Sequence, residues 1–225
     1  MSPAHAPTTV VIGGNRGIGL ALCRRLKSLG RDVIATCRSS SPALDALGAR
    51  VESGVDVTTD DGVAALARRL EGVAIDQLIC SAGILRQDDL DGVDLDDVRA
   101  QLEVNAIGPL RVVKALRRNV GRGGKIALIT SRMGSIADNG SGGYYGYRMS
   151  KAALNAAGMS LARDLKRAGI AVAILHPGYV RTDMTGGNGT VEADEAARQL
   201  CDRIAALTLE TSGTFWHASG EVLPW

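Results

Sequence analysis

The chain has 225 residues, of which 45% are hydrophobic and 22% are charged, and its formal net charge is +2. This length suits one α/β domain, so we expect a single domain over residues 1–225. Charges of both signs are mixed along the chain, which argues against a nucleic-acid-binding surface. No apolar run reaches the roughly 18 residues of a membrane span, and the start of the chain lacks the apolar core of a secretory signal. We therefore expect a cytoplasmic protein without nucleic-acid or membrane partners.

Short β-branched runs alternate with longer helical patterns along the chain. We predict strands at residues 8–14, 32–37, 49–57, 75–81, 125–130, 170–176 and 214–217. We predict helices at residues 17–29, 60–71, 94–120, 145–168 and 192–207. Most predicted strands are continuous apolar runs, as in a parallel sheet that helices cover on both faces. Repeated strand–helix–strand units predict an α/β fold with a doubly wound sheet of about seven strands, whose ligands bind beyond the carboxyl ends of the strands.

The four cysteines are Cys23, Cys37, Cys80 and Cys201, and none of them forms a C-x-x-C pair. Three of them lie inside apolar runs, so we expect reduced and mostly buried thiols, as in cytosolic proteins. No pair of histidines or cysteines has the spacing of metal ligands, and we expect no metal site.

A glycine-rich turn follows the first predicted strand. Gly13, Gly17 and Gly19 have the spacing G-x-x-x-G-x-G, and a helical pattern begins at once. Glycines allow a sharp turn, a close approach to a pyrophosphate and tight helix–sheet packing. The free N–H groups of the helix N-terminus then favour phosphate binding. A purely structural turn is the alternative, but the first βα junction of such a chain favours a dinucleotide site.

The end of the second predicted strand indicates which dinucleotide binds. NAD sites usually carry a carboxylate there, whereas this chain has Arg38 at that place. Arg16, inside the glycine-rich turn, could meet Arg38 around a 2′-phosphate. Two guanidinium groups facing one phosphate favour NADP(H) over NAD(H), although both arginines could also be solvated.

Two other strand ends suggest cofactor contacts. Asp56 could accept a hydrogen bond from the adenine amino group, and Val57 supplies a neighbouring backbone contact. Small residues at 81–83 leave room for the cofactor backbone. Each of these features alone is also typical of an ordinary turn.

Three of the four tyrosines lie within residues 144–147. Tyr147 and Lys151 are four residues apart, so in a helix they share one face. A lysine ammonium near a phenol stabilises phenolate and lowers the tyrosine pKa, which makes Tyr147 a usable acid and base. Tyr144 has Arg148 at the same offset, so spacing alone does not choose between them. An aromatic patch lining a pocket is the third interpretation.

Several motifs in this order resemble the short-chain dehydrogenase/reductase family, and among its members the carbonyl-reductase-like and C-factor-like branch. The resemblance covers nearly the whole chain and implies a Rossmann-type fold. It depends on the glycine-rich turn at 13–19, DV at 56–57, SAG at 81–83, VNAIGP at 104–109, TSRMGS at 130–135, YRMSK at 147–151 and HPGYVRTDM at 176–184. The chain departs from the family pattern at Ser81, usually Asn, and at Ile12, often Thr. The linker from Ser131 to Tyr147 is also slightly long.

The resemblance implies a catalytic tetrad of Asn105, Ser131, Tyr147 and Lys151. In it, Tyr147 exchanges a proton with a carbonyl oxygen while the nicotinamide exchanges a hydride, and Ser131 donates to the same oxygen. Lys151 lowers the pKa of Tyr147 and binds the nicotinamide ribose, and Asn105 holds a water molecule that resupplies protons. Taken singly, Asn105 is also typical of a helix kink, Ser131 of a strand-end cap and Thr182 of a helix N-cap.

The resemblance also implies a set of cofactor contacts, with a substrate-binding segment at about 178–192. These contacts are Gly13, Asn15, Arg16, Gly17, Ile18, Gly19, Arg38, Asp56, Val57, Ser81, Ala82, Gly83, Tyr147, Lys151, Pro177, Gly178, Val180 and Thr182. Residues 183–190 are short and contain three glycines, which indicates a flexible loop and an open site for aldehydes or ketones.

Two functions remain compatible with the sequence. The first is an NADP(H)-dependent oxidoreductase that interconverts a small-molecule carbonyl and an alcohol. The alternative is a cofactor-binding signalling protein of the C-factor-like type with little or no turnover. Relatives pair through long helices, here 94–120 and 145–168, so the resemblance implies a homodimer or homotetramer and leaves a monomer open.

Overall fold

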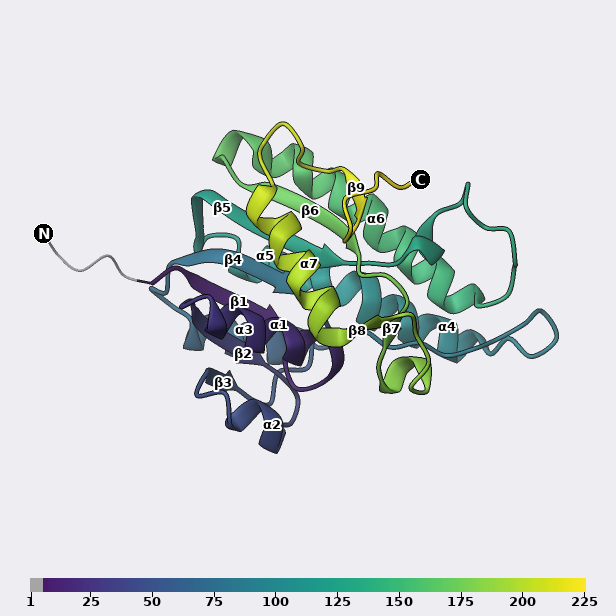
Figure 1. The fold of residues 1–225 in the computed structure, drawn as a ribbon, viewed down its shortest axis with the longest axis horizontal. Helices are drawn as coiled ribbons and strands as arrows, with labels where there is room; N and C mark the ends of the chain where they lie inside the picture. The colour runs from purple at the N-terminus through teal and green to yellow at the C-terminus, as the bar shows by residue number, and fades with distance from the viewer. Residues whose placement is uncertain (1–5) are drawn as a thin grey trace, which may run out of the picture.

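In the computed structural model, which describes residues 6–225, seven parallel strands form a sheet in the order β3-β2-β1-β4-β5-β6-β9 (Figure 1). The strands are β1 Thr8–Ile12, β2 Asp32–Thr36, β3 Arg50–Glu52, β4 Ile75–Cys80, β5 Val120–Ile129, β6 Ala171–His176 and β9 Phe215–His217. The predicted doubly wound sheet is thus confirmed. The expectation that the start of the chain is not a secretory signal falls partly on residues 1–5, which lie outside the described residues.

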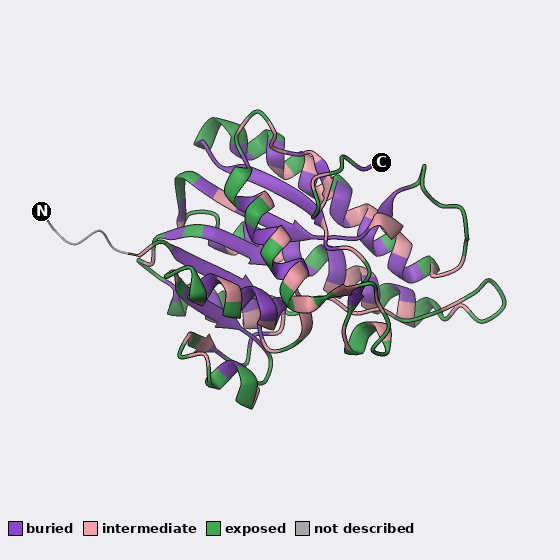
Figure 2. Cartoon of the chain, in the orientation of Figure 1, coloured by how far each residue is buried: buried purple, intermediate pink, exposed green. Residues whose placement is uncertain are grey.

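Helices cover both faces of this sheet. They are α1 Gly17–Ser28, α2 Pro42–Asp45, α3 Asp60–Arg69, α4 Leu95–Leu102, α5 Gly108–Leu116, α6 Tyr145–Leu165 and α7 Ala193–Ala206. Apolar residues of α1 and α7 share one core cluster with the sheet, and those of α3, α5 and α6 share the other. Both faces of the strands are therefore buried, while the outer helix faces are exposed (Figure 2). This two-sided burial is why the strands are continuously apolar.

Two strand boundaries differ from the prediction by five residues each. The third strand ends at Glu52 rather than at residue 57, because Gly54 turns the chain with a φ of +73°. The fifth strand begins at Val120, five residues before its predicted start, and its pairing with β4 is irregular near Ile75. The short helix α2 was not predicted.

The single helix predicted over 94–120 is wrong. The helix α4 ends at Leu102, a π-helical turn covers Glu103–Ile107, and α5 ends at Leu116. Pro109 has no N–H, so it cannot bond the carbonyl of the residue four positions earlier, as a regular α-helix requires. That residue is Asn105, which the wider turn holds fully buried.

Residues 183–190, predicted as a glycine-rich loop, do form a loop that contains a short 3-10 turn at Asp183–Thr185, but the two short strands that flank the loop were not predicted. Strands β7 Val180–Arg181 and β8 Val191–Glu192 pair in a second small sheet. Between them, the Thr185 hydroxyl donates to backbone carbonyls and accepts the N–H of Thr182 at 3.1 Å. The glycines serve this compact structure by adopting positive φ, as Gly186 does at +62°.

All four cysteines are free and buried, as predicted. Within residues 6–225, no helix is long and apolar enough to cross a membrane.

Candidate active site

A cleft of about 510 Å³ opens at the carboxyl ends of β1 and β4. This is the point where the strand order reverses, since β2 and β3 lie on one side of β1 and β4 lies on the other. Doubly wound sheets bind ligands at this position. Thirteen of the predicted cofactor contacts line the cleft: Gly13, Asn15, Arg16, Gly17, Ile18, Gly19, Arg38, Asp56, Val57, Ser81, Ala82, Gly83 and Thr182.

The glycine-rich turn forms the floor of the cleft. The N–H groups of Gly13 and Gly14 donate to the Thr36 carbonyl at 3.0 and 2.9 Å, which ties the turn to the end of β2. A Cβ at Gly19 would lie 1.9 Å from the Gly13 carbonyl oxygen, so α1 can start here only with glycine. Arg16, the N-cap residue of α1, makes no side-chain cap, and the first turn contains no acidic residue. This helix N-terminus is therefore suited to a phosphate.

The two arginines predicted to face a 2′-phosphate both line the cleft. Arg16 forms only a long, exposed ion pair with Asp183, at 4.0 Å. Asp183 itself lines the cleft, together with Met184. The carboxyl ends of β1 and β2 thus present two guanidinium groups to the same opening.

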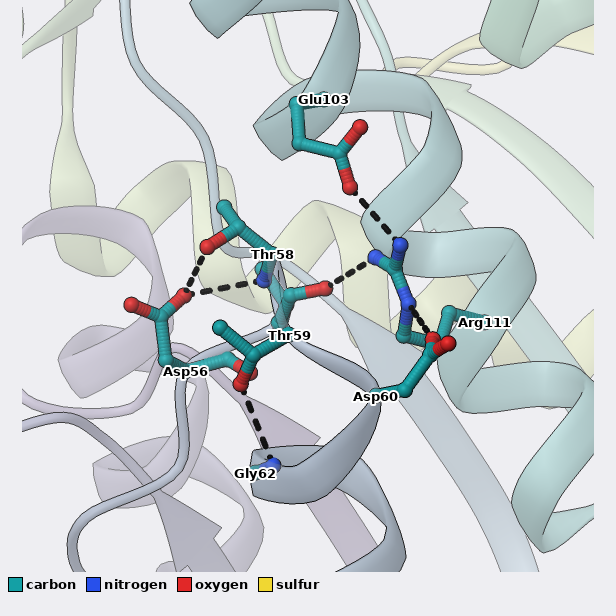
Figure 3. A network of polar contacts seen from close by, with 8 residues as sticks. Asp56, Thr58, Thr59, Asp60, Gly62, Glu103 and Arg111 are labelled. Atoms are coloured by element: carbon teal, nitrogen blue, oxygen red, sulfur yellow. Dashed lines mark hydrogen bonds and ion pairs between the residues drawn. The ribbon is translucent and has the colours of Figure 1, made fainter.

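Asp56 is held in place by its neighbour Thr58. One carboxylate oxygen accepts the Thr58 N–H at 2.9 Å and its hydroxyl at 2.7 Å (Figure 3). These hydrogen bonds keep the pKa of the Asp56 carboxyl below its usual value. Beside it, the Arg111 guanidinium binds the Val57 carbonyl and the Asp60 carboxylate, which fixes this loop to α5. An ionised Asp56 with one free oxygen remains available at the cleft.

The structure distinguishes the three clustered tyrosines. Tyr147 is buried, with 8% of its surface exposed, whereas Tyr145 is exposed and Tyr144 is half-buried. The Lys151 Nζ lies 5.7 Å from the centroid of the Tyr147 ring. Arg148, the competing partner of Tyr144, instead donates to the carbonyls of the linker that precedes α6 and to a serine hydroxyl there. The geometry therefore favours the Tyr147–Lys151 pair.

The pKa of Tyr147 does not follow the expected direction. Burial raises the pKa of Tyr147 to about 12, and hydrogen bonding with Ser131 only partly opposes this. Lys151 has not lowered it; burial instead lowers the pKa of Lys151 to about 8. The Lys151 ammonium donates to the Ile129 carbonyl at 3.0 Å. In this arrangement the phenol carries its proton at neutral pH.

We expect Lys151 to make stability depend on pH between about 8 and 10.5. Its folded-state pKa is about 8, against an ordinary value of 10.5, so the unfolded chain binds more protons in this range. The free energy of unfolding therefore rises with pH. Below pH 8 the folded protein bears a cost of about 3 kcal/mol for burying the charged Lys151 ammonium, and this cost disappears as the buried group loses its proton. Urea unfolding of wild type and Lys151→Met should show their difference in unfolding free energy changing in this window. If the difference in unfolding free energy between the two proteins did not change with pH, burial would not be lowering the pKa of Lys151.

Asn105 and Ser131 both lie next to this pair. The Asn105 amide exchanges two hydrogen bonds of 2.8 Å with the backbone of Ile84 and donates to Ser150 Oγ at 3.0 Å. Ser131 accepts the Met133 N–H at 3.2 Å, as a strand-end cap does, while its own O–H can still donate.

Gly83 connects the tetrad to the cleft. A Cβ at Gly83, which lines the cleft, would lie 3.2 Å from Asn105 Oδ1 and 3.7 Å from Lys151 Nζ. Asn105 and Lys151 therefore lie directly behind one wall of the cleft, and Tyr147 lies beside Lys151.

Some predicted contacts do not line the cleft, and some lining residues were missed. Tyr147, Lys151, Pro177, Gly178 and Val180 are not among its lining residues. The residues missed are Ile12, Thr36, Cys37, Val55, Thr58, Ile84, Val104, Asp183 and Met184. Most of these residues are adjacent in sequence to a predicted cofactor contact, so extending the predicted contacts by one or two residues along the chain would have included them. Val104 comes from the π-helical turn and directly precedes Asn105, so the VNAIGP motif at 104–109 could have indicated it.

Two histidines pack at the same end of the sheet. The rings of His176 and His217 meet edge to face at 5.1 Å, and burial lowers the pKa of His176 to about 3. His217 Nδ1 lies 2.7 Å from the Ser219 hydroxyl. Among residues 6–225, no group of three His, Cys, Asp or Glu side chains could hold a metal.

Comparisons with known proteins agree with this geometry. A family model described as short chain dehydrogenase matches residues 7–193. The 1-hydroxy-2-glutathionyl-2-methyl-3-butene dehydrogenase of Rhodococcus sp. (strain AD45) is 43% identical over 224 residues, 97% of this chain and 99% of the relative. The C-signal of Myxococcus xanthus is 44% identical over 138 residues, 60% of this chain and 83% of the relative. The crystal structure of NADPH-bound carbonyl reductase from chicken fatty liver has a TM-score of 0.88 at 29% identity, covering 98% of this chain and 100% of the other.

Proposed function

Because the chain belongs to the short-chain dehydrogenase/reductase family, we propose that it is an NADP(H)-dependent oxidoreductase that interconverts an aldehyde or ketone and an alcohol. One observation carries the proposal: the buried Tyr147–Lys151 pair lies behind the wall of a cleft suited to a dinucleotide. Relatives with dehydrogenase and carbonyl reductase activity support the reaction class. A bound nicotinamide would supply or accept the hydride.

The tetrad residues would handle the proton and the substrate oxygen. Tyr147 holds its proton at neutral pH, because burial raises its pKa, so it donates to the oxygen during carbonyl reduction. Ser131 donates its free O–H to the same oxygen and stabilises the developing charge. Lys151 binds the ribose hydroxyls and returns a proton toward Tyr147. Asn105 fixes the strand-end segment at Ile84, which forms part of the cleft.

The remaining predicted contacts would hold the cofactor. The N-terminus of α1 and the glycine-rich turn bind the pyrophosphate, and Asp56 accepts from the adenine amino group. Pro177, Gly178, Val180 and Thr182 contact the nicotinamide end, in a segment at 178–192 that also meets the substrate. Of these four, Thr182 lines the cleft.

We expect Arg38→Ala to weaken NADPH binding by about 10- to 100-fold, the value of one or two charge-assisted hydrogen bonds to a phosphate. NADH has no 2′-phosphate, so its Kd should change by less than about 3-fold. Fluorescence titration with both dinucleotides measures the effect. Arg24→Ala is the control, because this arginine of α1 pairs with Asp194 and does not line the cleft. Equal losses for NADPH and NADH would contradict a 2′-phosphate site.

The proposed function is tested by following NADPH absorbance with a panel of aldehydes and ketones. Consumption that depends on the carbonyl supports it. Tight NADPH binding without turnover of any panel member would reject it.

A second candidate is a signalling protein that binds the dinucleotide and acts through partner contacts. The identity with the C-signal favours it. It predicts NADPH binding with no carbonyl-dependent consumption, so the same assay separates the two candidates.

A further inference from the structure

The first turn of α6 carries Tyr147 and begins in an unusual backbone conformation. Tyr144, just before the helix, has a φ of +54°, the one positive value for a non-glycine residue in the described chain. This left-handed conformation costs roughly 1–2 kcal/mol for an L-residue. The Tyr144 side chain also makes no capping hydrogen bond. The helix start therefore depends on contacts from outside the helix.

Asp88, in the segment after β4, supplies the missing cap. Its carboxylate accepts the N–H groups of Tyr145 at 2.5 Å and Gly146 at 3.3 Å. Its backbone carbonyl accepts the Tyr144 N–H at 2.9 Å. These amides have no acceptor within the helix, and a negative charge is favourable at this end of the helix dipole. One residue thus satisfies three successive amides at the start of α6.

Side chains of α4 and of the π-helical turn hold the segment that contains Asp88 in place. Asn105 holds the backbone of Ile84, and Gln101 Oε1 accepts the Arg86 N–H at 2.9 Å. Gln101 is fully buried, and a Cβ at Gly146 would lie 2.4 Å from its Nε2. The N-terminus of α6 therefore packs closely against α4 where Gly146 meets Gln101.

We propose that Asp88 is a positioning residue that holds the Tyr147 phenol in its reactive place by capping the first turn of α6. The inference rests on the proposed function, in which Tyr147 exchanges the proton. Tyr147 is the third residue of the helix, so fraying of the first turn displaces it. A displacement of about 1 Å in a reacting group can lower a rate by about 100-fold. Asp88 does not line the cleft, so its effect falls on kcat rather than on NADPH affinity.

The test compares Asp88→Ala, Asp88→Asn and Asp88→Ser with wild type. We expect Asp88→Ala to lower kcat by about 10- to 50-fold with the KM for NADPH within about 2-fold. Asparagine keeps an acceptor oxygen on a side chain of the same length, so Asp88→Asn should keep kcat within about 3-fold of wild type, whereas the shorter serine, with one oxygen in place of two, should retain less of it. Asp89→Ala is the matched control, since Asp89 is exposed and only accepts the Gly92 N–H at 2.8 Å in its own loop.

A double variant and hydrogen exchange complete the test. In a Tyr147→Phe background, Asp88→Ala should cause no further loss of kcat, because its effect acts through the phenol. Amide exchange at Tyr145 and Gly146 should be faster in Asp88→Ala than in Asp89→Ala. If the alanine variant does not fold, Asp88→Asn takes its place in the exchange measurement, where at least one of these two amides should exchange faster.

Three results would overturn the inference: unchanged kcat in Asp88→Ala, a loss of kcat that Asp88→Asn does not rescue, or unchanged exchange at both amides. A wild type that turns over no carbonyl would reject the proposed function instead. In that case, the exchange measurement still decides whether Asp88 caps α6.

Discussion

Tyr147→Phe is expected to lower kcat for carbonyl reduction by about 10²- to 10⁴-fold, the usual contribution of general acid–base catalysis. The substitution removes only the hydroxyl, and the buried ring keeps its packing. The phenol has a pKa of about 12, so at neutral pH it holds the proton that a developing alkoxide needs. Because the glycine-rich turn and Arg38, to which we assign the phosphates of NADPH, are unchanged, the KM for NADPH should stay within about 3-fold. NADPH consumption at saturating carbonyl measures the loss.

Tyr144→Phe and Tyr145→Phe are the matched controls from the same stretch. We expect both to retain kcat within about 2-fold, since neither phenol lies beside a lysine. Activity that survives Tyr147→Phe and disappears in Tyr144→Phe would assign the proton transfer to Tyr144. Equal rates in wild type and Tyr147→Phe would remove Tyr147 from the mechanism.

Gly19→Ala is expected to weaken NADPH binding by about 100-fold and to lower the thermal stability of the protein. Its φ is outside the positive range, so the backbone conformation itself suits alanine. The obstacle is space, because the new methyl would lie 1.9 Å from the Gly13 carbonyl oxygen. Relief requires α1 to move away from the turn that holds the pyrophosphate, and such overpacking costs about 1–3 kcal/mol or more. Titration with NADPH and thermal unfolding measure both effects.

Gly121→Ala is the control for this substitution. Its Cβ would meet no atom within 4 Å and its φ is also outside the positive range, so we expect wild-type NADPH affinity and stability. If Gly19→Ala binds NADPH as wild type does, the glycine-rich turn is not the floor of the dinucleotide site.

The sequence predicted those features that depend on neighbouring residues. The alternating apolar runs predicted the sheet and its two helix layers, because a strand buried on both faces must be apolar throughout. The spacing from Gly13 to Gly19 placed the turn that forms the cleft floor. The offset of four between Tyr147 and Lys151 predicted their proximity, because residues four apart share a helix face.

Features that depend on distant contacts could not be predicted in the same way. The break in the helix predicted over 94–120 is an exception, because Pro109 inside that pattern already indicates a lost backbone hydrogen bond. The pairing of Val180 with Val191 depends on the fold of the glycine-rich loop between them. The cap from Asp88 to α6 joins two segments that no local pattern connects. The pKa of Tyr147 followed burial rather than the nearby charge, and spacing gives no measure of burial.

The buried cysteines have a consequence for handling the protein. Burial raises the pKa of Cys23 and Cys80 to about 12 and that of Cys201 to about 11. Alkylating and oxidising reagents attack thiolates, which are scarce at such values and shielded by the surrounding core. Any labelling of Cys23, Cys80 or Cys201 near neutral pH would therefore report transient opening of the sheet and its helices rather than chemistry of the native surface.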